Sequence, residues 1–261
     1  MQYDPIILVP VFIFGAVVGS FLNVVILRLP REDASIVFPA SHCPICRTPL
    51  HWYENIPVFS YLFLRGKCGH CNTRISLQYP TVEFLTGFMA AANLAAFGLS
   101  VAAVVFFIFS AALITIIWID IHHQIIPDII SKPGIIVGFC FSFFSPLTIW
   151  QDSLIGIVAG WGIFFSISLA YRLIRDQEGL GGGDAKLLAM LGAFLGWQSL
   201  LFIIFASSVT GSIAGLIAMP IQKKGGATRI PFAPFLALSG FLYLFFHAQI
   251  HHLFSLYLNS F

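Results

Sequence analysis

The sequence predicts an all-α polytopic membrane protein with about eight transmembrane helices and a small cytoplasmic zinc-binding domain inserted after the first helix. Three observations predict this fold class. Hydrophobic residues make up 58% of the 261 residues and charged residues only 9%, with a mean hydropathy of +0.92. A soluble domain carries about 25% charged residues. Long apolar segments recur along the chain, and four of the five cysteines gather in one polar insertion.

The first apolar segment, residues 5–27, predicts a membrane anchor that stays attached. A cleavable signal peptide has a positively charged N-region before its apolar core. Here the N-region holds no Lys or Arg, and the first basic residue, Arg28, follows the apolar run. We therefore expect residues 1–27 to form a first transmembrane helix that inserts with its N-terminus outside.

The insertion, residues 28–79, is the only stretch long enough for a soluble subdomain. It holds Cys43, Cys46, Cys68 and Cys71 as two C-x2-C pairs separated by 21 residues. This spacing is typical of paired knuckles that bind zinc tetrahedrally, and a metal can supply the folding free energy that so small a core lacks. Two disulfides or a redox pair are the alternative, which a cytoplasmic location disfavours. Four thiolates leave no open coordination position, so we expect a structural zinc site.

The rest of the chain, residues 80–261, predicts a helical bundle with short connections. A span needs about 17–25 apolar residues. The sixth apolar segment is short and rich in glycine, which suits a half-helix or re-entrant piece. The segments after the first are 80–98, 101–119, 133–150, 153–171, 186–197, 199–221 and 232–250.

The distribution of basic residues predicts the topology. With the N-terminus outside, twelve of the thirteen Lys and Arg residues fall in inside segments, whereas Asp4 and Asp152 lie outside. This obeys the positive-inside rule. The twelve residues are Arg28, Arg31, Arg47, Arg65, Lys67, Arg74, Lys132, Arg172, Arg175, Lys223, Lys224 and Arg229. The insertion and two conspicuous aspartates, Asp120 and Asp184, would then face the cytoplasm.

Asp120 ends the third apolar segment and Asp184 precedes the sixth, directly after three glycines. Carboxylates at membrane depth are costly, so each is a candidate functional residue. A pair could share a proton and activate water for hydrolysis of a peptide bond without a metal. Because 64 residues separate them, pairing requires their helices to be neighbours. The glycines would allow an extended peptide to approach closely.

Structural alternatives remain open for these acids. Asp184 could be a helix N-cap, and Asp120 could be a snorkelling or loop residue. Asp128 is the rival of Asp120, but it follows Pro127 and precedes an apolar segment, which favours a helix cap. No H-E-x-x-H or G-x-S-x-G motif points to a metalloprotease or a serine hydrolase.

The ordered motifs resemble those of the type IV prepilin peptidases, the bifunctional leader peptidase/N-methyltransferases that also process type II secretion pseudopilins. The resemblance spans nearly the whole chain. The matching stretches are Gly19–Pro30, Cys43–Cys46, Trp52–Pro57, Arg65–Cys71, Ile75–Ser76, Tyr79–Glu83, Asp120–Asp128, Gly181–Leu188 and Ile230–Phe235. One departure is Ala233, where the family's C-terminal motif usually has glycine.

The resemblance implies a specific activity. The enzyme would cleave the short basic leader of a prepilin at the cytoplasmic membrane face, between a Gly and usually a Phe. The catalytic aspartates would be Asp120 and Asp184, with Asp128 outside the dyad. S-adenosylmethionine would then methylate the new N-terminus. The expected partners are prepilins or pseudopilins and the bilayer of a bacterial inner membrane. We expect no nucleic acid, and the sequence leaves the oligomeric state open.

The position of the S-adenosylmethionine site is the weakest part of the resemblance. No G-x-G-x-x-G follows a strand, so the chain has no Rossmann unit. Candidates are Glu83 and Gly87 at the start of the second span, with Glu54 and Asn55. Glu83 could hold the cation of the cofactor or the new amine of the substrate. The structural alternative is an acid in the first helical turn and a glycine used for packing.

Two other functions compete with the bifunctional enzyme. The first is a peptidase without methyltransferase activity, which the four-cysteine insertion disfavours because peptidase-only relatives commonly lack it. The second is a proton-coupled transporter that uses the two aspartates as a relay. Transporters place such residues near the bilayer midplane, whereas Asp120 and Asp184 lie at segment ends.

Overall fold

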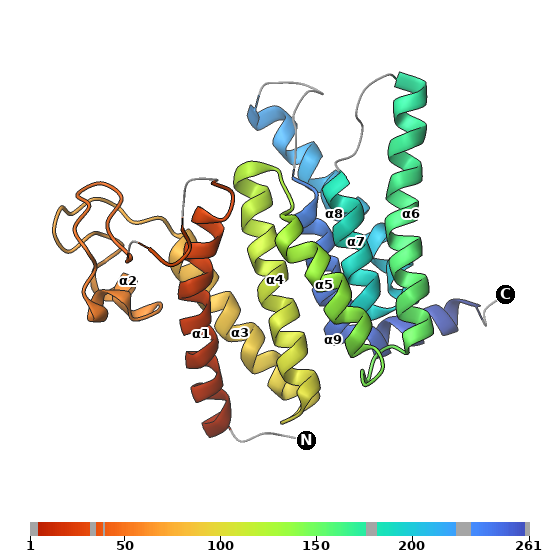
Figure 1. Ribbon diagram of the computed structural model, residues 1–261, viewed down its shortest axis with the longest axis horizontal. Coiled ribbons are helices and arrows are strands. Elements are labelled where there is room, and N and C mark those ends of the chain that lie inside the picture. Colours follow the sequence, from red (N-terminus) through yellow and green to blue (C-terminus); the bar gives the residue numbers. More distant parts are fainter. Residues whose placement is uncertain (1–4, 32–34, 39, 176–181, 223–230, 259–261) are drawn as a thin grey trace. The chain divides into compact units, whose positions relative to one another are not determined.

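The computed structural model describes residues 5–31, 35–38, 40–175, 182–222 and 231–258, and their secondary structure is helical apart from two isolated bridges (Figure 1). The elements in chain order are α1 Pro5–Arg28, the 3-10 helix η1 Trp52–Asn55, α2 Phe59–Phe63, α3 Gln78–Phe97, α4 Val101–His123, α5 Asp128–Phe141, α6 Trp150–Arg175, α7 Gly182–Leu195, α8 Trp197–Gln222 and α9 Ala233–Leu258.

Each of the eight predicted apolar segments corresponds to a helix longer than ten residues, and the all-helical fold class is confirmed. Among the described residues, five helices are long and apolar enough to cross a membrane, namely α1, α4, α6, α8 and α9. The total of eight spans therefore stays a prediction, because α3, α5 and α7 do not meet both criteria.

The bounds predicted for the fourth segment are wrong. The helix α5 covers Asp128–Phe141 rather than residues 133–150. Pro127 is its N-cap residue and has an extended backbone, so the helix starts as soon as the chain leaves that proline. At the other end, Pro146 disfavours a helical conformation of the residue before it. The helix therefore ends soon after Phe141, although the apolar character continues.

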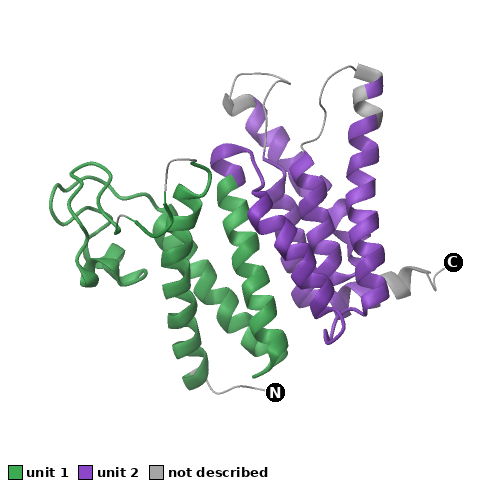
Figure 2. Cartoon of the chain, in the orientation of Figure 1, with its two compact units in different colours: residues 1–119 green, residues 120–261 purple. Residues whose placement is uncertain are grey.

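The chain divides into two compact units, residues 1–119 and 120–261 (Figure 2). This division falls within α4 and so does not coincide with the predicted boundaries after residues 27 and 79, which stay predictions. In unit 1, the backbones of α1 and α3 approach so closely at their glycines that no larger side chain would fit between them. A Cβ added at Gly15 would lie 2.6 Å from the Cβ of Ala90, and one added at Gly87 would lie 2.8 Å from the carbonyl oxygen of Phe12. Close helix crossings of this kind are typical of small residues in membrane proteins.

In unit 2, the short helix α7 forms the core. Its residues from Leu187 to Leu195 are all buried. Gly156 of α6 and Gly192 of α7 face one another in backbone contact, and Gly138 of α5 lies against Phe194. The glycine-rich sixth segment thus corresponds to a short central helix, which α5, α6, α8 and α9 surround.

Candidate active site and metal centre

The four cysteines of the insertion come together in one cluster. The four sulfur atoms of Cys43, Cys46, Cys68 and Cys71 all lie within 4.8 Å of one another. Two Sγ–Sγ distances, Cys43 to Cys71 and Cys46 to Cys68, are 3.8 and 4.0 Å. Tetrahedral zinc with bonds of about 2.3 Å requires sulfur atoms roughly 3.8 Å apart, so the donor set fits that ion. All four cysteines are free in the structure.

Two loops with the same hydrogen-bond pattern present these thiols. The N–H of Cys43 donates to the carbonyl of Thr48 at 3.0 Å, and that of Cys68 donates to the carbonyl of Thr73 at 2.8 Å. In each loop the residue after the second cysteine has a left-handed backbone, with φ of 57° at Arg47 and 56° at Asn72. Each pair therefore forms a knuckle whose shape depends on its own few residues.

Each knuckle also favours ionisation of its second thiol. Hydrogen bonding to the side chain and then the backbone of Thr48 lowers the pKa of Cys46. The same two groups of Thr73 lower the pKa of Cys71 to about 6. Because a thiolate, not a thiol, is the metal ligand, these threonines prepare the cluster for a cation. They were missed by sequence reasoning, although both stand two residues after a C-x2-C pair.

Glu54, a weaker cofactor candidate, belongs to the framework of the knuckles. Its side chain is only 5% exposed, and one carboxylate oxygen accepts the N–H of His51 at 2.9 Å. The other oxygen lies 3.9 Å from Nδ1 of His70. A Cβ added at Gly69 would lie 2.6 Å from that carboxylate. Glu54 therefore connects η1 to the second knuckle through its contacts with Gly69 and His70.

Asp120 lies near the end of α4 and is only 6% exposed. Its Oδ2 accepts a hydrogen bond of 3.1 Å from the backbone N–H of Ala233, 113 residues away in the chain. Ala233 is the first residue of α9 and is fully buried. The departure noted in the C-terminal motif therefore lies directly against a predicted catalytic residue. Sequence reasoning did not foresee this contact because backbone donors leave no mark in side-chain patterns.

Asp184 lies in the first turn of α7, the helix that begins at Gly182. The charge of Asp120 acts on Asp184, and their pairing as a catalytic dyad stays a prediction. Gly183 lies against Ile126, since an added Cβ would be 3.1 Å from the Cβ of that residue. Gly181 lies outside the described residues.

Asp128 is not the N-cap residue of its helix. The N-cap residue is Pro127, with Asp128 in the first turn, so the predicted capping role is wrong in that detail. Asp128 instead forms ion pairs with Lys132 at 2.7 Å and with Lys186 at 2.5 Å. Hydrogen bonds from Lys132 and then Lys186 lower the pKa of Asp128. The side chain is occupied by two ammonium groups.

Glu83 and Gly87, the predicted cofactor residues, both lie on α3. Glu83 is 8% exposed, and its Oε2 accepts the N–H of Val58 at 2.7 Å. This bond connects α3 to the insertion within unit 1. Gly87 contacts Phe12 of α1, which gives it a packing role. Their part in cofactor binding stays a prediction.

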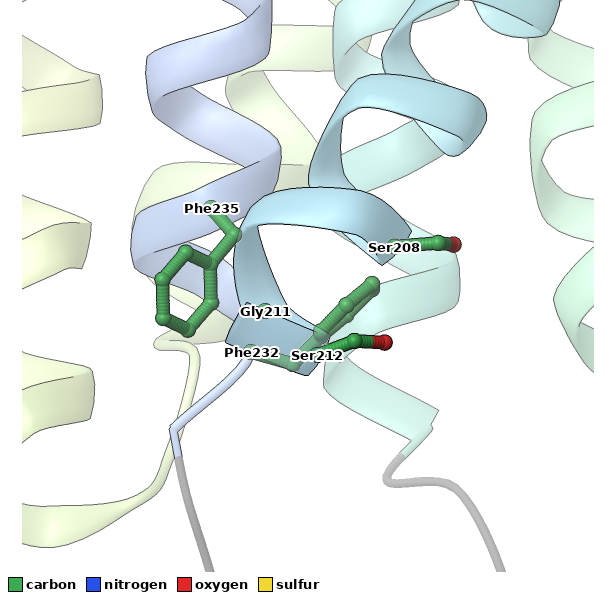
Figure 3. A pocket seen from close by; sticks show the side chains of 5 residues that line it. All are labelled: Ser208, Gly211, Ser212, Phe232 and Phe235. Atoms are coloured by element: carbon green, nitrogen blue, oxygen red, sulfur yellow. The ribbon is translucent and has the colours of Figure 1, made fainter. Parts of the chain in front are cut away.

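An open pocket of about 320 Å³ lies beside the start of α9 (Figure 3). Ser208, Gly211 and Ser212 of α8 line it together with Phe232 and Phe235. Phe232 directly precedes Ala233, whose N–H contacts Asp120. The pocket therefore adjoins the segment that supports the aspartate.

The comparisons with known proteins cover most of the chain. The family model of the bacterial peptidase A24 N-terminal domain matches residues 13–97, and that of the type IV leader peptidase family matches residues 107–216. Three curated proteins are each named prepilin leader peptidase/N-methyltransferase. The one from Stutzerimonas stutzeri is 37% identical, over 91% of this chain and 90% of its own length.

The other two give similar values. The protein from Burkholderia pseudomallei is 37% identical over 90% of this chain and 84% of its own length. The one from Pseudomonas aeruginosa is 35% identical over 91% of this chain and 90% of its own length. No solved structure matches the chain.

Proposed function

Because the chain belongs to the type IV leader peptidase family, we propose that it cleaves the basic leader of prepilins or pseudopilins and then methylates the new N-terminus. Cleavage takes place at the cytoplasmic face of a bacterial inner membrane, and S-adenosylmethionine supplies the methyl group. The observation that carries the proposal is the burial of Asp120 against the start of α9, where the N–H of Ala233 donates to it. The charge of Asp120 also acts on Asp184, 64 residues away in the chain.

The dyad performs acid–base chemistry on the scissile peptide. Two carboxylates that share one site cannot both ionise readily, so one of them would hold a proton near neutral pH. The ionised carboxylate takes a proton from water as the water oxygen attacks the scissile carbonyl. The protonated one donates a hydrogen bond to the carbonyl oxygen, where negative charge develops. The apparent titration belongs to the pair and not to either residue.

The N–H of Ala233 supports this arrangement. It holds one oxygen of Asp120 and leaves the other for water or for Asp184. A hydrogen bond to a carboxylate fixes its orientation as well as its charge. The start of α9 thus orients a catalytic group that α4 alone would leave free to rotate about its side-chain torsions.

The tetracysteine cluster is a structural metal site in this proposal. Its sulfur spacing supports tetrahedral zinc, which supplies folding free energy to a domain with few buried apolar residues. Cys43, Cys46, Cys68 and Cys71 would hold the ion with no open position. The domain in turn presents Val58 to Glu83, so the metal stabilises the surroundings of the methylation site.

The cofactor site of the methyltransferase lies along the start of α3. Near Glu83 in the sequence, two buried polar atoms, Oδ1 of Asn23 and Nε2 of Gln78, lack a hydrogen-bond partner. Asn23 of α1 donates from its amide nitrogen to the carbonyl of Tyr79 at 3.1 Å, which brings Asn23 to the start of α3, the helix that carries Gln78. A ligand with polar and cationic groups would satisfy them. S-adenosylmethionine supplies an electrophilic methyl group when bound, and Glu83 would orient the accepting amine.

The test uses purified protein in detergent with a prepilin and labelled S-adenosylmethionine. Leader loss and label on the new N-terminus are measured for the wild type, Asp120→Asn and Asp184→Asn. Cleavage and labelling by the wild type, with cleavage lost in both variants, are the expected results. Cleavage without label would leave a peptidase alone. Failure of the folded wild type to cut several prepilins would favour the transporter alternative.

A further inference from the structure

The segment between α4 and α5 connects the two helices next to the dyad. It begins at Gln124, whose φ of 55° lies in the left-handed region and ends α4. The N–H of Gln124 donates to the carbonyl of Asp120 at 2.9 Å. The segment therefore leaves α4 within one turn of a proposed catalytic residue, in a fixed direction.

This segment then contacts the first turn of α7 at two points. The side chain of Ile126 lies against Gly183, and Asp128 pairs with Lys186. Gly183 and Lys186 flank Asp184. The chain that follows one aspartate therefore holds the turn that carries the other.

The geometry of the helix explains why Lys186 matters to Asp184. Successive helical residues are rotated by about 100°, so positions 184 and 186 point to sides of α7 that differ by about 200°. A Lys186 side chain fastened to Asp128 therefore directs Asp184 away from α5. Gly134 of α5 also packs against Met190 of α7. Met190 is more than one helical turn from Asp184, so this contact does not set the position of the first turn of α7.

The pair is not a source of global stability. The side chains of Asp128 and Lys186 are 45% and 32% exposed, and exposed ion pairs contribute little to the free energy of unfolding. Asp128 already has a second partner, Lys132, four residues away on its own helix. That intrahelical pair cannot connect two elements, whereas the pair with Lys186 does.

We propose that Asp128 and Lys186 form a positioning pair that holds the first turn of α7, and with it Asp184, in register with Asp120. The inference rests on the proposed function and assigns a role to the acid that rivalled Asp120 in the sequence. Neither residue touches the substrate. Both act through the position of Asp184.

The first test is a double-mutant cycle on prepilin cleavage. Asp128→Asn and Lys186→Met should each lower kcat by about tenfold with little change in KM, since small misplacements of catalytic groups cost large factors in rate. The double variant should be no slower than either single one, because both remove the same contact. Lys186→Arg should restore most of the rate. Lys132→Met, which removes only the intrahelical partner, should match the wild type.

Independent losses that multiply in the double variant would overturn the proposal, as would full activity in either single variant. A rate reduced equally by Lys132→Met would also overturn it, since the effect would then follow surface charge. Thermal unfolding of each variant should stay within about 2 °C of the wild type, as expected for an exposed pair.

A second test requires no activity and so separates this inference from the proposed function. In a Cys140→Ser background, Asp120→Cys and Asp184→Cys together place thiols at both dyad positions. Their rate of disulfide formation with diamide should be high and should fall severalfold when Lys186→Met is added. The Lys132→Met change should leave the rate unaltered. Cross-linking unaffected by Lys186→Met would overturn the positioning role whether or not the protein cleaves prepilins.

Discussion

The tetracysteine cluster and the aspartate pair solve the same problem in different ways. Each must gather polar side chains at fixed distances, but the cysteines do so with two loops of about six residues each, in which Thr48 and Thr73 close the same hydrogen bonds. The aspartates depend instead on helices far apart in the chain, and their support comes from Ala233, Ile126 and Lys186. The first site is local and repeated, and the second is distributed.

This difference has a physical consequence. A local site that binds a metal gains its stability from the ion, so damage to it should appear as lost metal and lost protein. A distributed site on a buried core helix gains its geometry from packing that exists without the catalytic groups. Changes to those groups should abolish chemistry and leave the fold intact. The predictions below test this contrast, from the largest effect on cleavage to the smallest.

The largest effect is expected at the dyad. Asp120→Asn and Asp184→Asn should each lower the rate of prepilin cleavage by at least about a hundredfold, the lower range for loss of a general acid or base. Protein yield and zinc content should be unchanged. Leader loss on gels and metal analysis provide the measurements. Asp152→Asn is the matched control, because Asp152 contacts Trp197 and Gln198 rather than the dyad. Retained cleavage in both dyad variants would refute the mechanism.

The metal site should show the opposite behaviour. Cys43→Ser or Cys68→Ser should remove most of the bound zinc and lower the amount of folded protein, since both thiols are buried in the cluster. Zinc per chain, measured by elemental analysis, is the readout. Cys140→Ser is the control, because Cys140 is exposed and far from the cluster in the sequence. Full zinc content in either cluster variant would rule out the tetrathiolate site.

Glu83 belongs to neither region and should separate the two activities. Glu83→Gln and Glu83→Ala should both lower N-methylation by at least about tenfold, a modest figure for a group that orients the amine, while cleavage stays within about twofold. The glutamine variant keeps an acceptor for the N–H of Val58 and the alanine variant does not. Label on the new N-terminus is compared with leader loss. Normal methylation by the glutamine variant alone would show that Glu83 serves only to hold Val58.

The same contrast explains what the sequence could predict. The cysteine cluster could be predicted from the spacing of the cysteines, because the conformation of a C-x2-C loop depends on its own few residues. The helices followed from apolar runs, apart from the fourth, where Pro127 and Pro146 outweighed hydropathy. Asp120 and Asp184 could be singled out as costly charges, but their proximity could not be derived, since it depends on the packing of α7.

The supporting contacts were beyond the reach of sequence patterns for a related reason. The bond from Ala233 uses a backbone N–H, which every residue other than proline possesses. The pair of Asp128 with Lys186 joins residues 58 positions apart, and the local pattern favoured a helix cap instead. The role of Gly87 in cofactor binding stays a prediction, and its contact with Phe12 adds a close helix crossing that only the paired helices reveal.

The smallest effect is expected at Ala233, where the family usually has glycine. Ala233→Gly keeps the N–H that binds Asp120, so cleavage should stay within about twofold of the wild type. The loss of helix propensity at the start of α9 costs at most about 0.5–1 kcal/mol, visible as a slightly lower unfolding temperature. Ala233→Pro is the informative counterpart. Proline is tolerated at the first position of a helix but has no N–H, so this variant should lose far more cleavage than the glycine variant. Equal effects of the two substitutions would mean that the buried methyl group, and not the hydrogen bond to Asp120, is what the start of α9 contributes.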